Sequence, residues 1–212
     1  MSGRRSDLTP QTGRRLLSGL AALAAGLAFG CAPVSAQTGP DPIATTTAID
    51  CPRSVGAGVT CLSLQDEAGA WLIIAKPENW NGRLVVHAHG GPRMGEPERE
   101  DSLEDLDRFS VMVRQGYAWI GSSYRRGGYG VRSAAEDVDR SRTVFWDLFG
   151  RPERTLLHGQ SWGGNVAAKA AELYGLDDAG TLTYDGVLLT NGVLNGGTKA
   201  YQFRADLRAV YQ

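Results

Sequence analysis

Short apolar runs alternate along this chain with longer amphipathic stretches. Four runs of strand length precede polar or glycine-containing turns, at residues 84–86, 117–122, 154–158 and 185–190. Apolar runs of this length, bounded by turn signals, are typical of strands buried on both faces of a parallel sheet. Since amphipathic helices are predicted between them, the pattern indicates an α/β fold with a mostly parallel, doubly wound sheet and helices on both faces.

The first predicted helix spans residues 102–116, where apolar side chains recur at helical spacing. Ser102 is its candidate N-cap and Gly116 its stop signal. Seven acidic residues lie between positions 96 and 107. We interpret them as a solvated helix face, which is the commoner role of such a run than a cation site.

A second helix is predicted over residues 133–150 and a third over 163–174. Ser133 and Glu136 have the spacing of a capping box, and Gly150 ends the second helix. Its apolar face is formed by Ala134, Val138, Phe145 and Leu148.

Residues 59–64 and 70–75 have strand character and are separated by the turn-forming segment QDEAG. They predict an antiparallel hairpin at an edge of the sheet. Just before and within this hairpin lie Cys51 and Cys61. In an oxidising compartment two such cysteines are expected to form one disulfide that closes a short loop, whereas two thiols alone are a poor metal site.

The first 36 residues have the composition of a secretory signal peptide. Basic residues precede an apolar run from Leu16 to Phe29, and Val34-Ser35-Ala36 resembles a small-residue cleavage site. The run is short for a membrane-spanning anchor, so no stable anchor is expected after cleavage. Two weaker alternatives are a twin-arginine export signal, which Arg14-Arg15 resembles, and a lipid-modified Cys31, which the bulky Phe29 just upstream disfavours. We therefore expect a secreted or periplasmic protein.

Removal of the signal peptide leaves a mature chain suited to one soluble domain. Residues 37–47 are expected to be a flexible tether, and residues 48–212 one globular domain. The mature chain has 18 basic and 22 acidic residues, a net charge near −4. This balance excludes the strongly basic surface typical of nucleic-acid-binding proteins, and the oligomeric state is left open.

The candidate chemistry centres on the segment Gly159-Gln160-Ser161-Trp162-Gly163. It matches G-x-S-x-G and lies directly between a predicted strand and a predicted helix, as a nucleophile elbow must. A serine hydroxyl is a weak nucleophile and has to project from a tight turn, which Gly159 and Gly163 make room for. The N-terminus of the following helix adds partial positive charge for a developing oxyanion.

With this elbow and the segment HAHGGP at 87–92, the chain resembles the α/β-hydrolase superfamily, in particular its secreted serine esterases and peptidases. The resemblance implies that Ser161 is the nucleophile. It also implies that the oxyanion is held by the N–H of Trp162 and by one N–H of the Gly90-Gly91 turn. The substrate would be a small ester or a peptide, with the ester favoured, and no cofactor would be needed.

The three histidines of the chain all precede Ser161. His87 and His89 lie two apart on a strand and therefore face the same side, but a third ligand for a metal is not evident. We expect His89 to belong to the oxyanion loop, His87 to be its half-buried neighbour, and His158 to pack structurally.

In the superfamily that the chain resembles, the acid and the histidine follow the nucleophile. No histidine follows Ser161, and the last predicted strand is succeeded only by a polar segment in which residues 205–210 look like the start of a helix. The sequence is therefore interpreted as the N-terminal part of a serine hydrolase, with exposed apolar faces. The alternative is a non-catalytic remnant or binding module that retains the architecture.

Overall fold

The computed structural model describes residues 45–212. The predicted signal peptide and most of the predicted tether lie outside these described residues. Thr47, the last residue of the predicted tether, is already the first residue of a strand. None of the helices within 45–212 combines the length and the apolar character that crossing a bilayer requires.

The core of the fold is a seven-stranded mixed sheet in the order β1-β2-β3-β5-β4-β6-β7. Its strands are β1 (Thr47–Ile49), β2 (Val59–Gln65), β3 (Trp71–Pro77), β4 (Arg83–Ala88), β5 (Ala118–Ser122), β6 (Arg154–Gln160) and β7 (Gly186–Thr190). The last four are the strands predicted from the apolar runs, and they are mutually parallel. The predicted α/β class is confirmed.

The predicted hairpin of β2 and β3 forms, but it does not lie at the edge of the sheet. β1 pairs antiparallel with β2 and takes the edge, while β3 pairs antiparallel with β5 on its other side. The edge position was wrong because β1 has three residues and a single partly buried side chain, Ile49, so it has no alternating pattern to recognise.

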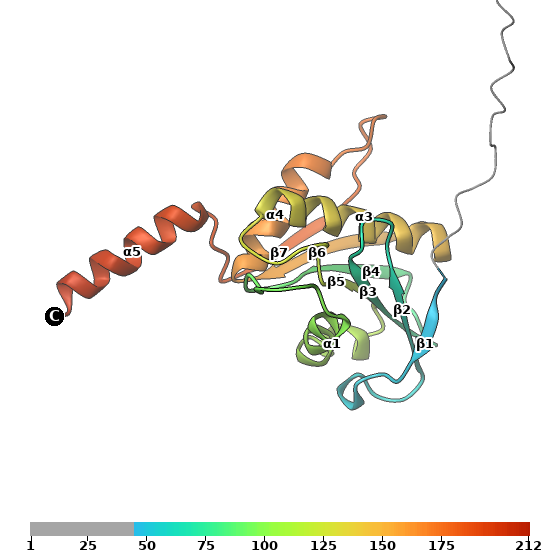
Figure 1. The fold of residues 1–212 in the computed structure, drawn as a ribbon. Coiled ribbons are helices and arrows are strands. Elements are labelled where there is room, and N and C mark those ends of the chain that lie inside the picture. The colour runs from blue at the N-terminus through green and yellow to red at the C-terminus, as the bar shows by residue number, and fades with distance from the viewer. Residues whose placement is uncertain (1–44) are drawn as a thin grey trace, which may run out of the picture. The chain divides into compact units, whose positions relative to one another are not determined.

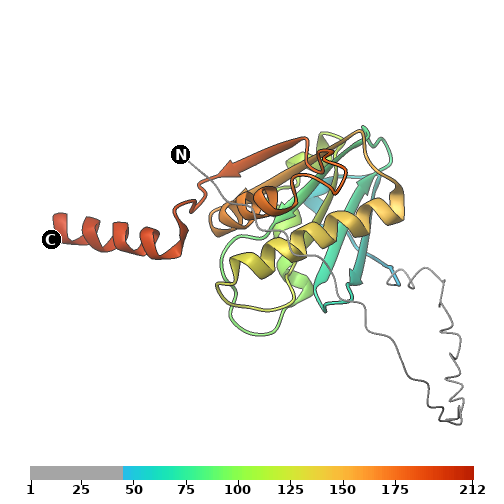
Figure 2. The same cartoon turned by 90° about the horizontal axis from the view of Figure 1, so that it is seen from above.

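Two helical layers cover the sheet (Figure 1). α3 (Val131–Phe149) and α4 (Trp162–Tyr174) pack on one face, and α1 (Arg99–Arg108), α2 (Val111–Arg114) and the 3-10 turn η1 (Arg53–Val55) lie on the other. Neighbouring strand residues alternate between the two cores: Leu84 and Val86 belong to the α3/α4 side, and Val85 to the α1 side. Figure 2 shows α3 and α4 lying side by side across the sheet.

Two predicted helix starts were wrong. α1 begins at Arg99 with a capping box between Glu98 and Asp101, so Ser102 lies inside the helix and is buried. α3 begins at Val131, and the hydroxyl of Ser133 donates to the carbonyl of Gly130. In both cases the chain enters the helix one turn earlier than the side-chain pattern indicates.

The ends of these helices agree better with the pattern. The helix predicted over 102–116 is interrupted after Arg108 and ends before Gly116, which has a positive φ of 84°. Gly150 ends α3 with φ 80°. Glycine adopts this left-handed conformation without the penalty that a Cβ atom brings, so it stops a helix effectively.

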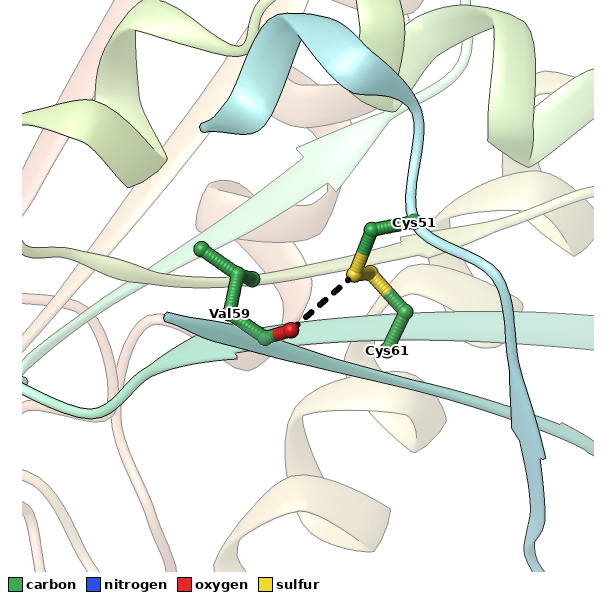
Figure 3. Close-up of a disulfide and its surroundings, with 3 residues drawn as sticks. All are labelled: Cys51, Val59 and Cys61. Carbon is green, nitrogen blue, oxygen red and sulfur yellow. Dashed lines mark hydrogen bonds between the residues drawn. A yellow bond between two sulfur atoms is a disulfide. The ribbon is translucent and has the colours of Figure 1, made fainter. Parts of the chain in front are cut away.

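Cys51 and Cys61 form a disulfide, as the sequence predicts (Figure 3). The Cys51 sulfur also lies 3.3 Å from the carbonyl oxygen of Val59. A disulfide sulfur carries no proton, so this approach is a contact and not a donated hydrogen bond. The crosslink ties the segment after β1 to Cys61 of β2, which pairs with Ile49 at the end of β1.

The helix expected near residues 205–210 is α5 (Gly196–Val210), and it begins earlier than expected. None of its residues is buried, and its apolar side chains Phe203, Leu207 and Val210 are exposed. Both views show α5 reaching away from the helices that cover the sheet (Figures 1 and 2).

Candidate active site

Ser161 occupies the sharp turn between β6 and α4. Its backbone has φ 57° and ψ −124°, a conformation that is strained for a residue with a side chain. Ser161 is exposed, whereas the next residue, Trp162, is buried. The turn therefore presents the hydroxyl to solvent at the carboxyl end of the parallel strands.

Glycine is required on both sides of this turn because backbone atoms occupy the space of a side chain. A Cβ atom at Gly159 would lie 2.2 Å from the carbonyl oxygen of Gly163. A Cβ atom at Gly163 would lie 2.3 Å from the carbonyl oxygen of Ala88, at the end of β4. The elbow is thus packed against the neighbouring strand end, which is the arrangement predicted from G-x-S-x-G.

The peptide groups of Ser161 are hydrogen-bonded to the last residue of β7 and to the segment that follows it. The N–H of Ser161 donates to the carbonyl of Thr190 at 2.9 Å, and the N–H of Val193 donates to the carbonyl of Ser161 at 3.2 Å. The strained turn is therefore held from both sides.

The predicted oxyanion donors lie beside the elbow. β4 and β6 are adjacent and parallel, and the register pairs Ala88 with Gly159. Consequently the loop after β4 begins where the elbow begins. A Cβ atom at Gly90 would lie 2.9 Å from the carbonyl oxygen of Gln160, so this loop touches the turn directly.

Trp162 is the first residue of α4, so its N–H has no acceptor within the helix. Its indole ring packs against two tyrosines of the loop after β5. The ring centroids lie 5.7 Å from Tyr124 and 5.4 Å from Tyr129. These contacts bury the Trp162 side chain and leave its backbone N–H at the helix N-terminus, where partial positive charge accumulates.

All three histidines are buried on the α1 side of the sheet, with exposed fractions of 1% for His87, 3% for His89 and 3% for His158. His87 and His158 are paired in the β4/β6 register, and their Nδ1 atoms are 2.9 Å apart. The structural role predicted for His158 agrees with this packing. His87 was expected to be half-buried, which was wrong, because the ring of Phe109 covers it from α1's end.

Asp105 of α1 is the shared partner of two of these rings. Its Oδ2 atom lies 2.5 Å from His89 Nδ1 and 3.2 Å from His87 Nε2, and the latter approach is poorly aligned for a hydrogen bond. His87 and His89 do face the same side, as predicted, but they face a carboxylate. Within residues 45–212 no group of three or more potential ligands is arranged to hold a metal ion.

This environment shifts two pKa values. Burial alone would raise the pKa of Asp105, but its interactions with His87 and His89 outweigh burial and hold that pKa well below its usual range. Burial lowers the pKa of His158 to about 4, helped by His87 and partly opposed by Asp105. Asp105 is therefore ionised and His158 neutral at pH 7.

Sequence reasoning missed the role of the acidic helix. Asp101 and Asp105 were interpreted as part of a solvated face, but both are only 7% exposed and face the loop after β4. Their spacing of four residues, next to the buried Ser102 and Leu106, was the signal that could have revealed them. This spacing is hard to recognise in the sequence because exposed acidic residues of the same chemistry surround Asp101 and Asp105.

Comparisons with known proteins give one similar sequence and many similar folds. No family model matches the chain. An o-phthalyl amidase from Xanthobacter agilis is 28% identical over 107 residues, which cover 49% of this chain and 22% of the amidase. The chain thus spans about one-fifth of that relative's length.

Among solved structures, lipase A of Candida antarctica in its closed state matches with a TM-score of 0.53 at 10% identity, over 70% of this chain and 41% of the lipase. Esterase B of Lactobacillus rhamnosis matches with a TM-score of 0.51 at 19% identity, over 68% of this chain and 51% of the esterase. The chain has the α/β-hydrolase fold that its elbow predicts, and it spans about half or less of the length of these structures.

Proposed function

We propose that Ser161 is the nucleophile of a serine hydrolase that cleaves carboxylic esters or amides through an acyl-enzyme. The observation that carries the proposal is the exposed Ser161 hydroxyl on a strained turn between a parallel strand and a helix N-terminus. The fold shared with a lipase and an esterase supports it, as does the partial similarity to an amidase. An ester is the preferred substrate class.

In the proposed reaction the Ser161 Oγ forms a bond to the substrate carbonyl carbon, and the carbonyl oxygen becomes an oxyanion. The N–H of Trp162 and an N–H of the Gly90-Gly91 turn donate to this oxygen. A base takes the serine proton and passes it to the leaving alcohol or amine as its bond to the carbonyl carbon breaks. Water then hydrolyses the acyl-enzyme, and the serine regains its proton.

The base of this reaction is proposed to come from residues outside the 212 of this sequence. His87, His89 and His158 are buried and engaged with one another or with Asp105. A general base needs to reach the serine hydroxyl directly or through one water. The chain spans only part of the lipase, the esterase and the amidase, which supports a base supplied by residues outside this sequence.

A fluorophosphonate probe tests the proposal because it bonds covalently to reactive serines. The elbow and the proposed oxyanion donors lie in this chain, and such groups retain part of the rate when the base is missing. We therefore expect the purified chain to be labelled slowly at Ser161, as located by mass spectrometry of the labelled peptide. Ser161→Ala should abolish the labelling. Ser133→Ala is the matched control, since Ser133 lies in the first turn of α3 on ordinary helical backbone, and it should leave the labelling unchanged.

Absence of labelling in a folded chain would contradict catalysis by this chain and favour a non-catalytic or binding role. Folding is checked by circular dichroism on the same sample. Labelling that persists in Ser161→Ala would show that another residue reacts, which would also refute the assignment.

Export to an oxidising compartment is a separate proposal. The Cys51–Cys61 disulfide supports it, because such crosslinks persist outside the reducing cytosol. N-terminal sequencing of protein recovered from the periplasm or the medium should begin at Gln37. Recovery of protein that retains residues 1–36 in the cytosolic fraction would refute it.

A further inference from the structure

α1 presents carboxylates to the sheet where a packed helix usually presents apolar side chains. Asp101 and Asp105 are each 7% exposed, whereas Asp107 on the same helix is exposed. Burying a carboxylate is strongly unfavourable unless the charge is paired and hydrogen-bonded. The partners of these two buried carboxylates are therefore the groups that α1 binds and stabilises.

Those groups lie in the loop after β4. Asp105 accepts a hydrogen bond from His89 Nδ1 at 2.5 Å, and Asp101 Oδ1 lies 3.1 Å from Arg93 Nε. Arg93 Nε also donates to His89 Nε2 at 3.3 Å, and Arg93 forms a further ion pair with Glu104. Because ionised Asp105 can only accept, His89 carries its proton on Nδ1 and accepts from Arg93 on Nε2.

The backbone of His89 is held as well. The hydroxyl of Tyr124 donates to the His89 carbonyl oxygen at 2.9 Å, and both groups are buried. His89 is thus fixed through both ring nitrogens and through its carbonyl. The next residue is Gly90, which touches the elbow at Gln160. The placement of the Gly90-Gly91 amides relative to Ser161 therefore depends on how His89 is held.

We propose that Asp105 is a positioning residue for the oxyanion loop, acting through His89. It does not contact substrate, and its role is to fix the loop amides at the distance from Ser161 that the transition state requires. This inference rests on the proposed serine hydrolase function. Oxyanion donors must be placed closely, since a misplacement of 1 Å costs roughly 100-fold in rate.

The first test is the rate of fluorophosphonate labelling of Ser161 in the full chain. Asp105→Leu removes the acceptor for His89. We expect this variant, in its folded form, to be labelled at a rate roughly 10- to 100-fold lower than the wild type. Asp105→Asn retains one acceptor oxygen for His89 and should recover part of the rate. Asp107→Asn is the matched control on the exposed side of α1 and should label at the wild-type rate.

The second test measures the loop directly by ¹⁵N relaxation and needs no reactivity. In the wild type, the order parameters of the Gly90 and Gly91 amides should be near those of a rigid backbone, about 0.85. In Asp105→Leu they should fall below about 0.6, while those of β4 and α1 remain unchanged. A general structural role would lower the values of α1 and β4 as well.

Unchanged order parameters at Gly90 and Gly91 in Asp105→Leu would overturn the positioning role. Where the wild type is labelled, an equal labelling rate in Asp105→Leu would do the same. A wild-type chain that is not labelled, but whose loop loosens in Asp105→Leu, would refute the proposed function and leave the positioning role supported. The two failures are thus distinguishable.

Discussion

At positions 159 and 163, backbone carbonyl oxygens occupy the space that a side chain would need. The elbow therefore tolerates only glycine at these two positions. Gly159→Ala should lower the free energy of unfolding by about 1–3 kcal/mol, because the atoms that would be displaced are backbone and cannot rotate away. Urea denaturation measures the change. Gly186→Ala is the control, since its Cβ would meet only the flexible end of Leu156 and should cost less than about 0.5 kcal/mol.

His158 should make the fold sensitive to mild acid. Its pKa falls from 6.5 in the unfolded chain to about 4 in the fold, so the native state binds fewer protons between these values. Stability should therefore decrease as pH falls from about 6.5 to about 4, by about 3 kcal/mol, and level off with respect to this group below that. His158→Gln cannot titrate, and its unfolding midpoint should vary less over the same range. Identical pH profiles would contradict the assignment.

The local geometry of single residues was predictable where it depends on neighbours in sequence. Gly159, Ser161 and Gly163 form a contiguous motif, and the turn between β6 and α4 follows from it. The burial of Asp105 depends instead on His89, sixteen residues away, and on the register that places His87 beside His158. Such pairings require the folded sheet, so the spacing of Asp101 and Asp105 could at most indicate a shared helix face and not the groups that they contact.

The disulfide stabilises an edge strand that has little core of its own. β1 contributes only the partly buried Ile49, and the bridge closes a short loop between Cys51 and Cys61. Replacing both cysteines by serine should lower the free energy of unfolding by about 2–4 kcal/mol. Amide hydrogen exchange of residues 47–49 should also become faster than that of β3.

Reduction of the wild type with dithiothreitol is the control and should reproduce the behaviour of the double serine variant. Equal unfolding free energies in the oxidised and reduced proteins would show that β1 is held by its ladder alone.

At the level of elements, the parallel strands and the helices were predictable because apolar periodicity is a local property. The residues at which the helices begin were less predictable. Glu98 caps α1 together with Asp101, although serine and threonine are the stronger N-cap signals, and Gly130 precedes α3. β1 was missed since a three-residue strand is defined by its partner β2 and not by its own pattern.

The whole molecule has an uncovered apolar region on the α1 side of β7. Among the described residues, β7 has no partner on its outer edge. Val111 and Leu188 are about half exposed and line a hollow of about 260 Å³ together with Val85 and Leu156. An open strand edge beside exposed apolar side chains favours association between chains.

We expect the purified chain to self-associate with increasing concentration, as measured by analytical ultracentrifugation. Leu188→Lys should reduce this association, because a charge beside the open edge opposes pairing. Leu182→Lys is the matched control, since Leu182 is equally exposed but lies in the turn before β7 and outside the hollow. A similar effect of both variants would indicate that net charge, and not this surface, governs association.

The hydrogen bonds that join Ser161 to the end of β7 and to the segment after it have a mechanical consequence. Thr190 accepts from the Ser161 amide, Val193 donates to its carbonyl, and α5 starts three residues further on. A displacement of α5 would act through this short connection on the peptide groups of Ser161, and we expect it to change the orientation of the proposed nucleophile's hydroxyl.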